Sequence, residues 1–297
     1  MKNTNCTKYA IRLAAFYFIF AGFSQTVHAQ SEIKFRLAHD TVIIVSMLVN
    51  GQGPFDFVLD TGTDTSIVDP SVARQASLPS LGQIELETVA GPQTLTRSSL
   101  HNLAAGPVQA ENLEVLVQDL SEMRNVDPHI QGIAGQNFLS HFNYLLDYRK
   151  RSIRIEAAHE IRDSIGGESV PMERRENMMI VPTETQSQGG AKLHLLLDSG
   201  ANLVVLLRRP DQGLDRVNRQ DWLAVTASGQ NGMQVGQVRA LKVGSEEFRN
   251  LAVALPPAQS ADEERVEDGL LPTSLFNAVY VNNQERFLVF NPHVKKN

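Results

Sequence analysis

Two short motifs in the sequence place an aspartate directly after an apolar stretch. Asp60-Thr61-Gly62 follows residues 55–59, and Asp198-Ser199-Gly200 follows residues 195–197. A carboxylate at the end of a buried strand is costly to ionise unless nearby groups stabilise its charge. The hydroxyl and the glycine that follow each acid can do so, through hydrogen bonds and close approach of backbone amides. One such motif proves little, but the second suggests that the two acids act together.

Two neighbouring carboxyl groups can hydrolyse an amide without a metal. Because both cannot ionise easily, the pair supplies a general base that activates water and a general acid that protonates the departing nitrogen. The sequence offers no competing chemistry. Its only cysteine is Cys6, its eight histidines include no pair at metal-ligand spacing, and it has neither a Gly-x-Ser-x-Gly motif nor a phosphate-binding loop. We therefore expect no metal and no cofactor.

The acid motifs belong to an internal duplication. They lie 138 residues apart, and the octets at residues 132–139 and 269–276 follow them at nearly the same offset. Glycine markers between motif and octet, and the strands after each octet, repeat in the same order. Such a repeat predicts two copies of one structural unit.

The duplicated motifs resemble those of the aspartic proteases. Residues 133–137, Ile-Ala-Gly-Gln-Asn, are particularly similar to the segment beneath the acid loop of retroviral-type proteases. The closest resemblance is to exported bacterial aspartyl proteases built from two retropepsin-like units, and it covers about residues 33–292. It implies an all-β, two-lobed acid-protease fold in which each lobe is a closed β-barrel.

The resemblance also implies roles for individual residues. Asp60 and Asp198 would form the catalytic dyad of an aspartic endopeptidase. Thr61 and Ser199 would brace the acid loops through hydroxyl hydrogen bonds, and Gly62 and Gly200 would let backbone amides reach the carboxylates.

One difference between the motifs concerns the residue that follows each glycine. Thr63 follows the first motif and Ala201 the second, so only Asp60 has a hydroxyl side chain at this position. Hydrogen bonding to a carboxylate favours its charged form. We therefore expect Asp60 to hold the negative charge more often and Asp198 to hold the shared proton.

A protein or peptide substrate is expected to lie extended across both lobes, as an added strand. The candidate flaps are the turns around Gly91 and Gly229. Pepsin-type flaps carry a tyrosine, but residues 81–100 contain no aromatic side chain. This favours retroviral-like flap behaviour or a different ligand.

The first 29 residues are expected to be a signal peptide. Lys2, Lys8 and Arg12 precede an apolar stretch too short to span a bilayer, and small residues precede Gln30. Cleavage would leave an N-terminal lobe at residues 30–160 and a C-terminal lobe at residues 161–297. The protein would be exported to the periplasm or the extracellular space; the alternative is an uncleaved interfacial anchor.

The mature chain would carry 24 basic and 33 acidic residues, a net charge of −9. That charge disfavours nucleic acid and anionic membranes as partners, and we expect no stable membrane insertion once the leader is removed. The duplication makes a monomer with two pseudo-symmetric lobes the expected state. Pairing of lobes from different chains is the alternative.

Local patterns predict the elements around the motifs. Residues 41–49 and 55–59 should form a hairpin, with residues 178–181 and 193–197 as its counterpart. Short helices are expected at residues 70–76, after Asp69 as N-cap, and from Asn137 through Phe142. Residues 157–176 are expected to be a polar join, because they contain Gly166-Gly167 and show no sustained periodicity.

Two departures from the family pattern leave a second function open. Pro272 stands where the first half has Gly135, and Asn202-Leu203 replaces the small hydroxyl residues common after the second motif. Either could displace the second acid loop. The alternatives are a catalytically inactive peptide-binding or scaffold module of the cell envelope, and a selective processor of one protein instead of a digestive enzyme.

Overall fold

The structure is a computed structural model that describes residues 31–88, 91–156, 159–175, 177–185, 191–207, 214–226, 229–256 and 266–295. The expected signal peptide lies outside these residues. Strands make up most of the regular structure, so the all-β prediction is confirmed. The helices are α1 (Pro70–Gln75), η1 (Met123–Asn125), α2 (Gln136–Leu139), α3 (Glu160–Ser164) and η3 (Thr273–Leu275). No helix in the described part of the chain is long and apolar enough to cross a membrane.

The first half forms an eight-stranded sheet in the order β2-β3-β4-β9-β5-β8-β7-β6. An additional pairing of β3 with β7 closes six of these strands into a ring, which we call the first barrel. The strands of this sheet are β2 (Arg36–Ala38), β3 (Val42–Val49), β4 (Gln52–Leu59), β5 (Ile67–Val68), β6 (Ser80–Thr88), β7 (Gly91–Ala105), β8 (Val108–Val117) and β9 (Ile130–Ala134).

The second half repeats this topology in the order β14-β15-β16-β21-β17-β20-β19-β18, and β15 pairs with β19 to close the second barrel. In both barrels the strand before the acid runs parallel to the strand of the following octet. The strands are β14 (Glu173–Arg175), β15 (Met178–Thr185), β16 (Ala191–Asp198), β17 (Val204–Leu206), β18 (Leu214–Thr226), β19 (Gly229–Val243), β20 (Glu246–Leu255) and β21 (Gly269–Pro272).

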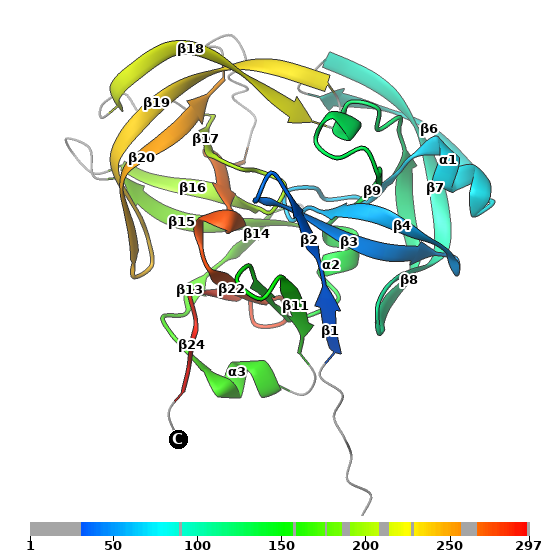
Figure 1. Ribbon diagram of the computed structural model, residues 1–297, viewed down its shortest axis with the longest axis horizontal. Helices are drawn as coiled ribbons and strands as arrows, with labels where there is room; N and C mark the ends of the chain where they lie inside the picture. The colour runs from blue at the N-terminus through cyan, green and yellow to red at the C-terminus, as the bar shows by residue number, and fades with distance from the viewer. Residues whose placement is uncertain are drawn as a thin grey trace, which may run out of the picture.

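A third sheet joins the two halves below the barrels (Figure 1). Its order is β1-β11-β10-β22-β23-β13, with β10 of the first half paired antiparallel to β22 of the second. Its strands are β1 (Ser31–Lys34), β10 (Tyr144–Asp147), β11 (Ser152–Ile155), β13 (Val170–Pro171), β22 (Ala278–Asn282) and β23 (Phe287–Phe290). A short pair, β12 (Ile165–Gly166) with β24 (His293–Val294), completes the described strands.

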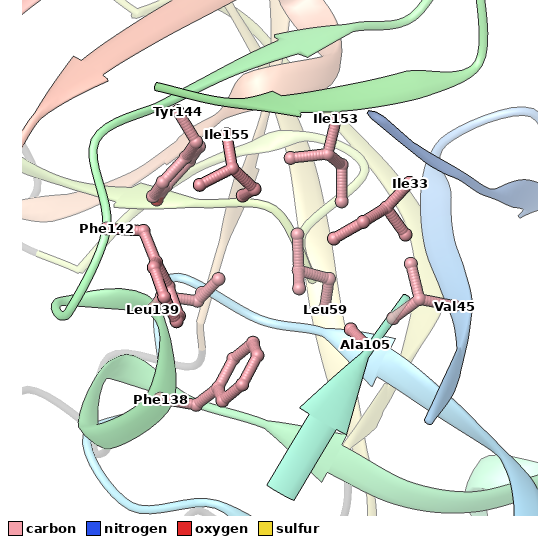
Figure 2. A pocket seen from close by; sticks show the side chains of 10 residues that line it. All are labelled: Ile33, Val45, Leu59, Ala105, Phe138, Leu139, Phe142, Tyr144, Ile153 and Ile155. Atoms are coloured by element: carbon pink, nitrogen blue, oxygen red, sulfur yellow. The ribbon is translucent and has the colours of Figure 1, made fainter. Parts of the chain in front are cut away.

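The apolar core is continuous between the halves. One cluster of buried side chains includes Phe57 and Leu59 of β4, Leu195 and Leu197 of β16, and residues of the joining sheet. A small apolar cavity lies within it, lined by side chains of β1, β3, β4, β7, α2, β10 and β11 and by neighbouring residues (Figure 2). The strands that carry the acids are therefore anchored in one core, which limits their relative movement.

The local predictions met different outcomes. Both hairpins form, and α1 begins after Asp69, whose side chain accepts a hydrogen bond from the Ser71 amide at 2.9 Å. The second helix ends at Leu139 and not at Phe142, because the chain must turn there to enter β10. The join contains regular structure, namely α3 and β12 to β14. The lobe boundary at residues 160 and 161 stays a prediction.

Candidate active site

Strands β4 and β16 deliver the two acids to the junction between the barrels. Asp60 follows the last residue of β4, and Asp198 is the last residue of β16. The preceding side chains, Leu59 and Leu197, are at most 2% exposed. Burial of these apolar residues fixes the ends of both strands, so the acids project from rigid elements.

The loops that follow the acids interlock through two buried hydroxyl groups. Thr61 Oγ1 donates to the carbonyl oxygen of Leu197 at 2.8 Å, and Ser199 Oγ donates to that of Leu59 at 2.6 Å. The backbone amide of Thr61 donates to Ser199 Oγ, and that of Ser199 to Thr61 Oγ1, at 3.0 and 2.9 Å. Each hydroxyl therefore accepts one bond and donates another, and both side chains are fully buried. The network couples the loop positions directly.

The two carboxyl groups lie against each other's loop. A Cβ atom built on Gly62 would be 2.6 Å from Cγ of Asp198, and one on Gly200 would be 2.9 Å from Cγ of Asp60. Any side chain at either glycine would displace the opposite carboxyl group. The structure thus brings together Asp60, Asp198 and both glycines of the motifs.

Hydrogen bonds distinguish the two acids. Asp60 accepts from the Gly62 amide on Oδ1 and from the Thr63 hydroxyl on Oδ2, both at 2.8 Å. Oδ1 of Asp198 accepts hydrogen bonds from the backbone amides of Gly200 and Ala201, at 2.7 and 3.0 Å. Only Asp60 therefore has a side-chain hydroxyl donor in its own loop.

The electrostatics favour unequal proton occupancy. Burial raises the pKa of Asp198 well above its ordinary value, and the charge of Asp60 raises it further. Burial also raises the pKa of Asp60, but the hydrogen bonds from Thr63 and Gly62 oppose that rise. Two like charges this close cannot both form cheaply, so the arrangement favours a singly ionised pair with its proton on Asp198.

The first octet supports the first acid loop from below. The carbonyl oxygen of Ala134 accepts a hydrogen bond from the Asp60 amide at 3.0 Å, and the amide of Gln136 donates to the carbonyl oxygen of Thr63 at 2.8 Å. The Gln136 side chain also donates to the carbonyl oxygen of Thr61 at 2.8 Å. A Cβ atom on Gly135 would lie 2.7 Å from the Thr63 oxygen, which explains why glycine occupies this position. Gln136 belongs to the motif at residues 133–137, but the contact of its side chain with the loop could not be deduced from the sequence.

The family departures do not displace the second loop. Leu197 pairs with Leu271 in the parallel register of β16 and β21, as Leu59 pairs with Ala134 in the first half, and Asp198 pairs with Pro272 in the same register. Asn202 lies beyond the two amides that bind Asp198. The second carboxyl group keeps its place against Gly62.

Each predicted flap residue begins the second strand of a long hairpin. Gly91 pairs with Thr88 at the end of β6 and β7, and Gly229 pairs with Thr226 at the end of β18 and β19. The tips, residues 89–90 and 227–228, lie outside the described residues. No described contact joins either glycine to the acids, so their role as flaps stays a prediction.

The comparison with protein families agrees with this geometry. The model of the aspartyl protease family matches residues 45–138 and residues 184–275, and each match contains one acid motif and most of the octet that follows it. The two matches together span more than half of the chain, which therefore belongs to the aspartyl protease family. No curated protein matches the chain.

Proposed function

We propose that the protein is an aspartic endopeptidase whose single active site is shared by the two halves. The observation that carries the proposal is the mutual packing of Asp60 and Asp198 against Gly200 and Gly62. Family membership supports protease chemistry, and the paired carboxyl groups provide both functions that amide hydrolysis needs.

The unequal acids divide the reaction between them. Ionised Asp60 accepts a proton from a water molecule, whose oxygen attacks the carbonyl carbon of the scissile peptide. Protonated Asp198 gives its proton to the carbonyl oxygen, so a neutral tetrahedral diol forms. When the C–N bond breaks, the nitrogen takes the proton held by Asp60, and a hydroxyl proton of the diol returns to Asp198. Aspartic proteases in general use this exchange of one shared proton.

The substrate is proposed to be a protein or peptide bound in extended form between the barrels. The hairpins β6–β7 and β18–β19, which end near Gly91 and Gly229, are the candidate flaps, one from each half. Main-chain hydrogen bonds to such hairpin strands would add the substrate as a further strand. We further propose that the exported enzyme acts as a monomer in the periplasm or the extracellular space.

A peptide library with diverse sequences tests the proposal. The wild-type protein and the double variant Asp60→Asn/Asp198→Asn would be incubated with the library from about pH 3 to pH 7, with products identified by mass spectrometry. We expect cleavage only by the wild type, and the cut sites would show whether recognition is broad or selective. Peptide binding without cleavage by folded wild-type protein would instead support the inactive binding module.

A further inference from the structure

The two acid loops are supported by different means. Below the first loop, the backbone amides of Gln136 and Asn137 donate to the carbonyl oxygens of Thr63 and Asp64, at 2.8 and 2.9 Å. The corresponding turn in the second half is η3, which begins directly after Pro272. Within the described residues, no backbone hydrogen bond joins η3 to Ala201 or Asn202. Among the described residues, the second loop therefore lacks the backbone hydrogen bonds that the first loop receives from its octet.

A tyrosine from the first half contacts this turn. Tyr148 follows the last residue of β10, and its hydroxyl lies 2.6 Å from Oγ1 of Thr273, the first residue of η3. Thr273 is fully buried, and its neighbour Pro272 pairs with Asp198. The amide of Tyr148 also donates to the carbonyl oxygen of Asn277 at 3.0 Å, and its ring packs edge-on against Phe35. Backbone, ring and hydroxyl thus all hold this side chain in place.

The internal symmetry shows that crossing contacts of this kind belong to the fold. Asn283 follows the last residue of β22, as Tyr148 follows that of β10. Its side-chain amide donates across the junction to the carbonyl oxygens of Leu139 and Phe142, at 3.3 and 2.5 Å. Each half therefore contacts the helical turn at the end of the other half's octet, but only the contact with the second turn is a pair of hydroxyl groups.

Tyr148 and Thr273 form a neutral pair of hydroxyl groups. They carry two O–H protons, and the hydrogen bond between them uses one. Burial raises the pKa of Tyr148, and ionisation of nearby Asp198 would raise it further, so the phenol keeps its proton. A neutral pair of this kind adds no competing charge beside the dyad.

We infer that Tyr148 is a positioning residue for Asp198, acting through Thr273 and the β21–η3 segment. The inference rests on the proposed function, because it concerns how the proposed catalytic pair, Asp60 and Asp198, is held in position. Loss of the hydroxyl should let the second loop move away from the first, which weakens the interaction between the carboxyl groups. In a coupled pair that interaction sets the separation of the two apparent pKa values, so they should converge.

The test compares Tyr148→Phe, Thr273→Val, their double variant and Thr273→Ser. Tyr144→Phe is the matched control, because Tyr144 begins β10, the strand that Tyr148 follows, and its buried hydroxyl has no hydrogen-bond partner in the described part of the chain. Two quantities are measured for each variant: kcat and KM on a cleaved peptide, and the titration of the dyad by carbon-13 NMR of labelled aspartate, with signals assigned from Asp60→Asn and Asp198→Asn. The titration needs no turnover.

We expect kcat of Tyr148→Phe to fall about fivefold to tenfold, the factor that one buried hydrogen bond carries, with KM nearly unchanged. Thr273→Val should match it, the double variant should be no worse than either, and Thr273→Ser and Tyr144→Phe should keep wild-type behaviour. The two apparent pKa values of the dyad should move closer together in Tyr148→Phe and stay unchanged in Tyr144→Phe.

An unchanged dyad titration in folded Tyr148→Phe would overturn the inference, as would losses that multiply in the double variant. Failure of the proposed function is distinct, because it would appear as wild-type protein that cleaves nothing. Convergence of the titration in such a protein would still support the positioning role.

Discussion

Replacing Thr63 by alanine removes the hydroxyl that donates to Oδ2 of Asp60 at 2.8 Å. That bond stabilises the charged form of Asp60 and lowers its pKa, so its loss must raise the pKa. Protonation of the dyad to its inactive neutral form should then begin at higher pH. The acid limb of the activity profile should therefore move towards neutrality.

The magnitude follows from the kind of bond and from its exposure. A hydrogen bond to a charged group contributes about 1.5 to 3 kcal/mol, but Thr63 is only partly buried and water can replace part of it. About 1 kcal/mol remains, which corresponds to about a fivefold loss of kcat/KM on the acid limb. Near the optimum, where the dyad is singly ionised in both proteins, the loss should be small.

The assay is the pH dependence of kcat/KM for wild type, Thr63→Ala and Thr63→Ser on one peptide. The serine variant keeps the hydroxyl and should retain the wild-type acid limb. An acid limb that does not move in folded Thr63→Ala would refute the assignment of the negative charge to Asp60.

Three further changes test other parts of the structure. The Arg36 guanidinium lowers the pKa of Asp127 from 3.8 to about 2, so this stabilisation is complete above pH 4 and is lost as the pH falls through 2. Asp127→Asn should cost about 1 to 2 kcal/mol in urea unfolding at pH 6, after allowance for the exposure of Arg36, and much less at pH 2. Gly62→Ala places a Cβ atom 2.6 Å from Cγ of Asp198, so activity should fall about 100-fold or more in a peptide assay. Ser199→Ala leaves two buried backbone groups without their partners and should lower the free energy of unfolding by about 2 to 3 kcal/mol, whereas Ser199→Thr should not.

Much of the fold could be predicted from the sequence because the duplication is recorded in it. Matching offsets between motifs and octets predicted two similar barrels, and alternation of apolar residues located the hairpins before the acids. The strands β12 to β14 could not be found in the same way. They are two or three residues long, too short for any periodicity, and the partners of β12 and β13 lie far along the chain.

The candidate site likewise contains residues that the sequence predicts and one that it does not. The identity of the two acids and the hydroxyls beside them follows from local motifs, which the structure brings together. Tyr148 carried no such signal, because it lies 50 residues before Asp198 and contacts Thr273 only after the two halves have packed. Contacts of this kind depend on tertiary arrangement, and a single sequence does not reveal them.

The most direct test of the shared site is the activity of the single variants Asp60→Asn and Asp198→Asn. Each keeps the shape of the carboxyl group and removes its acid–base function, so we expect both to lose at least about 100-fold to 1000-fold in kcat. Both should remain folded, because each removes a buried carboxyl group that is costly to ionise. A folded Asp198→Asn or Asp60→Asn variant that cleaves peptides at the wild-type rate would contradict a site built from both acids.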